Sequence, residues 1–218
     1  MSEIDSATPH LDSLRSNNIH FPKDPMRRVT EKEARLRALH PRLALMAPDT
    51  SWRESYMAQI DNGWHDYKHD AQALREPAAF ALFVDKIASG RSWDGSQECH
   101  VRWLVDPQRR EMLGRVRLKN IHAPAADPVW LDPAATMGGH VGYSICPASR
   151  GRGLSTLMLS LALDECFAMG LRECRYFVAD SNEAPIRTTL GCGGVRQDRQ
   201  LHHEGQLYSS HRIELAAA

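Results

Sequence analysis

One short segment of the sequence combines residue types that bind anions. Residues 145–155 read ICPASRGRGLS, so two arginines and two glycines stand between an expected strand and an apolar helix. The first amides of a helix lack intrahelical acceptors and carry the positive end of its dipole, and glycines there let an oxyanion come close. Arg150 and Arg152 add formal charge and bidentate donors. The segment therefore predicts a phosphate-binding loop.

Two other kinds of phosphate loop are excluded by their details. Gly151 and Gly153 are not followed by the third glycine of a dinucleotide fingerprint, and no Gly-Lys-Ser/Thr of a Walker loop is present. Chemistry on a nucleoside triphosphate is therefore not expected for this chain.

The loop needs a strand before it and a helix after it. Residues 139–145 predict the strand, and the apolar spacing of residues 154–169 predicts the helix, which Gly170 would end. Together with the remaining elements this order predicts a mixed α/β fold. Strands are expected at 42–47, 100–105, 112–118 and 175–179, helices at 30–40, 51–63 and 64–89 and from Ser181, and a closing hairpin about Glu204-Gly205.

Length and composition indicate a folded protein with no net charge. The 218 residues are 42% apolar and 25% charged, and 27 basic residues balance 27 acidic ones, so no global field attracts nucleic acid or anionic lipid. The five cysteines form no CxxC pair, and the first residues lack the features of a signal peptide. We expect a cytoplasmic protein with no membrane span, an N-terminal arm with a short helix over residues 1–40 and one domain over residues 41–218.

The residues around the loop resemble those of a known family. Arg150-x-x-Gly153-x-Ser155 resembles the Arg/Gln-x-x-Gly-x-Gly/Ala pyrophosphate signature of the GNAT superfamily of acyl-CoA N-acyltransferases, with serine at the last position. Residues 139–145 (GHVGYSI) are similar to the fourth strand of that family, and residues 181–187 (SNEAPIR) to its later short helix. In particular, the chain resembles bacterial predicted acetyltransferases whose strand reads Gly-Gly-His-hydrophobic-Gly-Tyr-Ser.

The resemblance is close over residues 138–195, looser over residues 41–137 and absent before them. It implies a GNAT-like α/β (α+β) fold, in which a mixed, mostly antiparallel central sheet is splayed between two strands and flanked by helices. Acetyl-CoA, the cosubstrate that the resemblance implies, would enter the splay.

The resemblance also implies which residues hold acetyl-CoA. Backbone groups of Ile145 and Cys146 would pair with the pantetheine arm of acetyl-CoA. Asn182 would contact the same arm from the opposite side of the binding site, and Arg187 would contact the nucleotide end. The pyrophosphate would be cradled by the residues of the loop, namely Arg150, Gly151, Arg152, Gly153, Leu154 and Ser155.

The implied reaction is direct attack of an amine on the thioester, which needs a base, a donor to the oxyanion and a proton for the leaving thiolate. His140 is the candidate base, because the ordinary pKa of histidine is about 6.5; alternatively, it holds the loop through a hydrogen bond. Many family members carry a tyrosine seven residues after the asparagine, but here that position is Thr189. Water or Tyr208 would then protonate the thiolate, or it would leave unassisted.

Three interpretations stay open from the sequence. The first is an acetyl-CoA-dependent N-acetyltransferase acting on a small-molecule or peptide amine; the second is a non-catalytic, regulatory acyl-CoA-binding protein. The third, a nucleic-acid module on Arg109-Arg110 and the loop arginines, is disfavoured by the neutral net charge.

No metal is expected, because spacing places no carboxylate or cysteine ligand beside His65 and His69. No nucleic acid or membrane partner is expected either. A homodimer is suggested only by the resemblance, because members of that family often form dimers.

Overall fold

The computed structural model describes residues 27–64, 71–95, 97–119, 139–203 and 205–215. Their strands form two sheets, one in the order β1-β2-β3-β4 and one in the order β5-β7-β6, and every paired neighbour is antiparallel. The strands are β1 (Ala44–Met46), β2 (Cys99–Asp106), β3 (Glu111–Lys119), β4 (Val141–Ile145), β5 (Glu173–Ala179), β6 (Val195–His203) and β7 (Gln206–Glu214). The mixed, mostly antiparallel α/β fold expected from the sequence is confirmed.

The helices also follow the expected order. They are α1 (Glu31–Leu39), η2 (Thr50–Trp52), α2 (Arg53–Asp61), η3 (Ala73–Arg75), α3 (Pro77–Ala88), η5 (Pro147–Ser149), α5 (Leu154–Ala168) and α6 (Glu183–Gly191). The helix expected over residues 64–89 differs, since its regular part begins only at Pro77. Proline suits the first helical turn because its φ is fixed there and its missing N–H is not needed. Residues 65–70 lie outside the described part of the chain.

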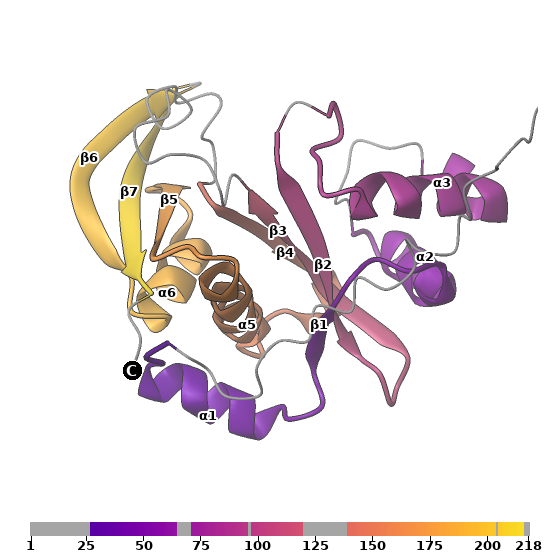
Figure 1. Ribbon diagram of the computed structural model, residues 1–218, viewed down its shortest axis with the longest axis horizontal. Helices are drawn as coiled ribbons and strands as arrows, with labels where there is room; N and C mark the ends of the chain where they lie inside the picture. The colour runs from indigo at the N-terminus through magenta and orange to yellow at the C-terminus, as the bar shows by residue number, and fades with distance from the viewer. Residues whose placement is uncertain (1–26, 65–70, 96, 120–138, 204, 216–218) are drawn as a thin grey trace, which may run out of the picture.

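The first sheet has a different apolar core on each of its faces. On one face α5 packs against β3 and β4, and its leucines join those of the sheet. On the other face α2 and α3 cover β3 and β2 with a mainly aromatic cluster that includes Tyr56, Phe80 and Trp103. Figure 1 shows α5 and the α2–α3 pair on opposite sides of this sheet.

The two sheets meet at the start of β4. The amide of His140 donates to the carbonyl oxygen of Arg175 (2.9 Å), and the Arg175 amide donates to His140 Nδ1 (3.0 Å). Beyond this contact β4 and β5 belong to different sheets and stand at their adjoining edges. The open edge of β4 is thus a place where a ligand can form hydrogen bonds with the strand backbone.

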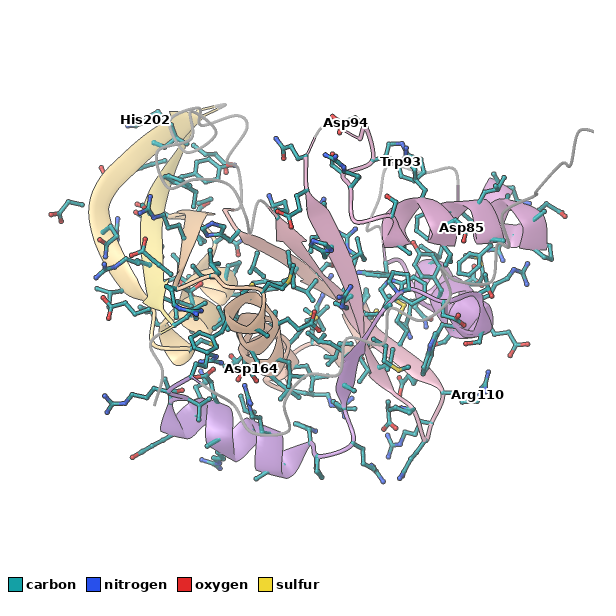
Figure 2. The ribbon with its side chains drawn as sticks, viewed as in Figure 1. Asp85, Trp93, Asp94, Arg110, Asp164 and His202 are labelled. Carbon is teal, nitrogen blue, oxygen red and sulfur yellow. The ribbon has the colours of Figure 1, made fainter. Side chains whose placement is uncertain are left out.

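A buried ion-pair network holds α1 against α5. The guanidinium of Arg27 contacts Glu33 and, at 2.8 Å, Asp164, and Arg37 reaches the other oxygen of Asp164 at 2.7 Å. Asp164 lies on the side of α5 that faces α1 (Figure 2). Thr30 and Glu33 close the capping box that the sequence predicted. The described part of the expected arm therefore packs onto the rest of the fold, and its separation from the domain at residue 40 stays a prediction.

Candidate functional site

The loop predicted to bind phosphate ends in a helix N-terminus that no side chain caps. Gly153 is the N-cap residue of α5 and has a left-handed φ of 75°. This backbone conformation favours glycine; a Cβ here would also lie 2.9 Å from a methyl carbon of Leu36 on α1, which would have to shift. The first amides of α5 are therefore open to an external acceptor.

The edge of β4 beside this helix offers backbone groups as well. The Cys146 amide donates to Leu113 on β3, and the Lys119 amide of β3 donates to His140. Because hydrogen-bonded pairs alternate in an antiparallel ladder, the backbone groups of Tyr143 and Ile145 point away from β3. In the described chain, these groups face the gap between the two sheets.

A cavity of about 480 Å³ joins the helix N-terminus to this strand edge. Its walls come from β4, from the loop and start of α5, and from α6. The lining residues are Tyr143, Ser144, Ile145, Ser149, Arg150, Gly151, Gly153, Leu154, Ser155, Asn182, Ala184, Pro185 and Thr188.

Most of the predicted cofactor residues meet in this cavity. Ile145, Leu154, Ser155, Arg150 and the two loop glycines all line it. The Nε of Arg150 donates to the Ile145 carbonyl at 3.2 Å, which keeps the guanidinium beside the helix N-terminus. Asn182, at the start of α6, also lines it, and its side chain makes no capping hydrogen bond.

Three of the predicted cofactor residues lie elsewhere. Cys146 is fully buried, and both of its backbone groups are used inside the protein, the amide by Leu113 and the carbonyl by the Ser149 amide. Arg187 is 67% exposed, pairs with Glu183 one turn earlier and is not part of the cavity lining.

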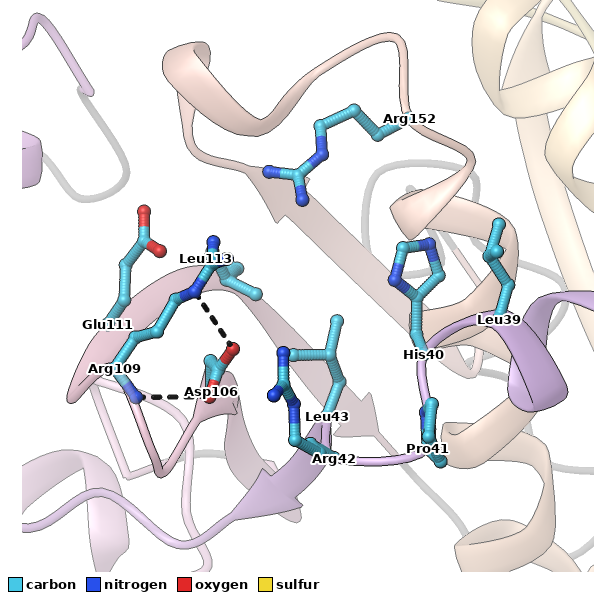
Figure 3. A pocket seen from close by; sticks show the side chains of 10 residues that line it. All are labelled: Leu39, His40, Pro41, Arg42, Leu43, Asp106, Arg109, Glu111, Leu113 and Arg152. Atoms are coloured by element: carbon cyan, nitrogen blue, oxygen red, sulfur yellow. Dashed lines mark hydrogen bonds and ion pairs between the residues drawn. The ribbon is translucent and has the colours of Figure 1, made fainter.

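Arg152, the third, lines a separate cavity of about 250 Å³. Figure 3 shows Arg152 entering this second cavity from the loop, His40 and Arg42 from the connection between α1 and β1, and Arg109 from the β2–β3 turn. The Arg109 side chain is paired with Asp106 at 3.9 Å. Because charges of both signs line this cavity, its field favours no one class of ligand.

His140 occupies the junction of the two sheets and not the cavity. Its side chain is 5% exposed, and its Nδ1 accepts the Arg175 amide. Burial, together with the nearby Arg175 charge, lowers the pKa of His140 to about 4. The side chain is neutral near pH 7 and a weak base, and its hydrogen bond joins β4 to β5 and does not reach the loop.

Tyr208 and Thr189, the two hydroxyl residues considered for the thiolate, are also absent from the lining. Tyr208 lies on β7 opposite Ala179, and the Thr189 side chain is buried. A residue that sequence reasoning did not select, Tyr143, also lines the cavity; its hydroxyl is buried, and burial raises its pKa to about 12. Alternation along β4 puts Tyr143 on the same face as Ile145, but only the cavity lining shows that Tyr143 lies near α6.

In the described ranges, no three side chains of histidine, cysteine, aspartate or glutamate gather as metal ligands. None of the helices in those ranges combines the length and apolar character that a bilayer crossing needs.

Comparisons with known proteins agree with this architecture. The family model described as an acetyltransferase (GNAT) domain matches residues 35–195, whereas no curated protein matches. Among solved structures, the chain is similar to the microcin C7 self-immunity acetyltransferase MccE in complex with acetyl-CoA and AMP, with 13% identity over 80% of this chain and 93% of that one and a TM-score of 0.55.

Two further solved structures are similar to this chain to a comparable degree. A Bordetella pertussis protein described as a GNAT-family acetyltransferase has 16% identity over 78% of this chain and 94% of its own, with a TM-score of 0.53. A mutant of the spermidine N-acetyltransferase SpeG of Vibrio cholerae has 17% identity over 80% of this chain and 94% of its own, with a TM-score of 0.52. The family model spans most of the chain, including the loop, β4 and α5, and so the chain belongs to the GNAT acetyltransferase family and is an acetyl-CoA-dependent N-acetyltransferase.

Proposed function

We propose that acetyl-CoA binds in the 480 Å³ cavity and passes its acetyl group to the amine of a small molecule or peptide. The observation that carries the proposal is the meeting, in one cavity, of an uncapped helix N-terminus, an arginine and an open strand edge. The first two suit a pyrophosphate, and the third suits an amide-containing arm that continues the ladder.

The binding residues differ in part from those expected from the sequence. The backbone groups of Tyr143 and the amide of Ile145 would pair with the pantetheine arm, because those of Cys146 are already engaged and the Ile145 carbonyl accepts from Arg150. Asn182 would donate from α6, and Arg150 and Ser155 would hold the pyrophosphate. Arg187 would contribute little, since its side chain is exposed and paired.

The reaction would proceed by attack of the neutral amine on the thioester carbonyl. A nitrogen–carbon bond forms, the carbon–sulfur bond breaks, and the amides of Tyr143 or Ile145 stabilise the oxyanion. The described lining residues include no histidine or carboxylate, so water would carry the proton from the amine to solvent. His140 would hold the sheet junction instead of acting as the base.

Tyr143 would assist the leaving sulfur. Because its pKa of about 12 lies above that of an ordinary thiol, about 8.5, full proton transfer from the phenol to the thiolate is unfavourable. The hydroxyl would therefore donate a hydrogen bond to the developing thiolate, which solvent then protonates. A hydrogen bond to a charged group contributes about 1.5–3 kcal/mol, or roughly 10- to 100-fold in rate.

Release of the free CoA thiol in the presence of small amines, lysine, peptides with free amino termini and spermidine tests the function. We expect turnover with at least one acceptor, a Tyr143→Phe variant with kcat lowered about 10-fold or more at unchanged KM for acetyl-CoA, and a Tyr208→Phe control with unchanged kcat. A protein that binds acetyl-CoA but releases no thiol with any amine would instead be a regulatory acyl-CoA-binding protein.

A further inference from the structure

The second cavity, of about 250 Å³, adjoins the acetyl-CoA cavity across one loop. Arg152 lines the second cavity, whereas the residues on either side of it, Gly151 and Gly153, line the acetyl-CoA cavity. Figure 3 shows the side chains of Arg152 and Arg42 extending into the second cavity from two sides. Sites for drug-sized ligands measure roughly 300–1,000 Å³, so this cavity suits a smaller molecule.

Two of the charges that line the second cavity offset each other. The Asp106 carboxylate is 7% exposed, and one of its oxygens lies 3.9 Å from Arg109 Nε. Its other oxygen accepts hydrogen bonds from the backbone amides of Gln108 (3.0 Å) and Arg109 (3.1 Å). This carboxylate is therefore already compensated inside the protein, and the remaining charges decide which ligand the cavity suits.

Three charged side chains of the lining have no ion-pair partner among the described residues. Arg42 donates a hydrogen bond to the neutral Gln108 (2.9 Å). Within the described ranges, the side chains of Arg152 and Glu111 make neither an ion pair nor a hydrogen bond. Two cations and one carboxylate thus line one small space. A ligand with charges of both signs matches this set, because its anionic group suits the arginines and its cationic group suits Glu111.

The rest of the lining is an imidazole and apolar side chains. His40 Nε2 is buried and has no hydrogen-bond partner in the described part of the chain, and a carboxylate beside it would provide one. Leu39, Leu43 and Leu113 supply apolar surface, and Leu39 is 66% exposed. An apolar group on the ligand would remove part of this surface from water.

We propose that the second cavity binds a free α-amino acid with an apolar side chain, as an effector of the acetyl-CoA site. Arg42 and Arg152 bind its carboxylate, and Glu111 binds its ammonium group. Because Arg152 belongs to the loop, the bound amino acid holds the loop in the form whose glycines line the acetyl-CoA cavity, and so raises the affinity for acetyl-CoA. The binding is independent of the proposed function, whereas the effect on acetyl-CoA rests on it.

Leucine and two analogues that each lack one charge test the binding. Leucine, 3-methylbutylamine, which has no carboxylate, and 4-methylpentanoate, which has no amine, are each titrated into the parent protein by calorimetry without acetyl-CoA. We expect leucine to bind at least about 10-fold more tightly than either analogue, because each analogue loses one hydrogen-bonded ion pair.

Two variants assign the charges to the two ends of the ligand. Glu111→Gln is expected to bind leucine no more tightly than 4-methylpentanoate, and Arg42→Gln no more tightly than 3-methylbutylamine. Arg187→Gln removes an equal charge from α6, outside both cavities, and is the matched control, which is expected to bind leucine as the parent does.

The effect on the acetyl-CoA site is measured with CoA, which carries the same pyrophosphate and cannot transfer an acetyl group. Saturating leucine is expected to lower the Kd of CoA at least about 5-fold in the parent, and CoA is expected to lower the Kd of leucine by the same factor. In Arg152→Gln, the same concentration of leucine is expected to leave the Kd of CoA unchanged.

The proposal is overturned if leucine binds no better than its two analogues, if Glu111→Gln and Arg42→Gln keep the preference for leucine, or if leucine does not lower the Kd of CoA in the parent. Failure of the proposed function is seen separately, as a parent protein that binds leucine but whose unfolding midpoint does not move with acetyl-CoA.

Discussion

Arg27 and Arg117 both reach into the body of the molecule, but their surroundings carry opposite charge. Arg27 meets the carboxylates of Glu33 and Asp164 and joins α1 to α5. Arg117 lies in a row with Arg115 and Lys119 on the opposite face of the sheet. The difference separates an arginine that is paired with carboxylates from one whose Nε has no hydrogen-bond partner among the described residues, and substitution of each arginine by methionine distinguishes the two.

The largest effect is expected for Arg27→Met. Its side chain is 1% exposed and that of Glu33 is 0% exposed, so the variant leaves a buried carboxylate without its cation. Loss of one partner of a buried pair costs about 3–5 kcal/mol of unfolding free energy, measured by denaturant titration. Arg187→Met, which breaks an exposed pair, should change it by at most about 1 kcal/mol. Equal effects would mean that the Arg27 network does not hold α1.

A somewhat smaller effect is expected at the junction of the sheets. The pKa of His140 is lowered to about 4 when folded, so the unfolded chain binds the proton more tightly. Stability from this group is present above about pH 6.5 and is lost as the pH falls toward 4, by about 3 kcal/mol. His140→Gln should lack this part of the pH dependence, as measured by unfolding at pH 7 and 4.5. Parallel curves for parent and variant would show that His140 does not remain neutral in the fold.

The smallest effect is expected for Arg117→Met. Because removal of this cation relieves Lys119 and leaves no described carboxylate unpaired, the unfolding free energy should stay within about 1 kcal/mol of the parent or rise. The pKa of Lys119, followed by NMR titration, should move up toward 10.5. A loss as large as that of Arg27→Met would indicate that Arg117 has a structural partner after all.

The loop and its flanking elements were predictable because their signals are local. Glycines and prolines mark the ends of β4, the loop and α5, and the left-handed Gly153 is required by the turn itself. The capping box of α1 could likewise be found from four consecutive residues, Thr30 to Glu33. These features depend on neighbours in sequence, so one chain is enough to find them.

The residues proposed for catalysis were not predictable because they depend on strand register. The pairing of β3 with β4 turns the backbone of Tyr143 toward the cavity and that of Cys146 toward Leu113. The hydrogen bond between His140 and Arg175 joins positions 35 residues apart. The alternation of Arg115, Arg117 and Lys119 is visible in the sequence, yet it reads as the polar face of a strand until the structure places β4 beside it.

The most direct test of the account is the unfolding midpoint with and without acetyl-CoA in the parent, in Ser155→Glu and in Ser51→Glu. A glutamate in the first turn of α5 suits the helix dipole, by about 0.3–1 kcal/mol, but occupies the place proposed for the pyrophosphate. Ser51→Glu makes the same change near the start of α2, away from the cavity.

The account predicts stabilisation of the parent and of Ser51→Glu by about 2.7 kcal/mol at one hundred times the Kd of acetyl-CoA, and none for Ser155→Glu, which should remain folded. A parent midpoint that does not move with acetyl-CoA, or a Ser155→Glu protein that keeps the full shift, would contradict the assignment of this cavity to the cofactor.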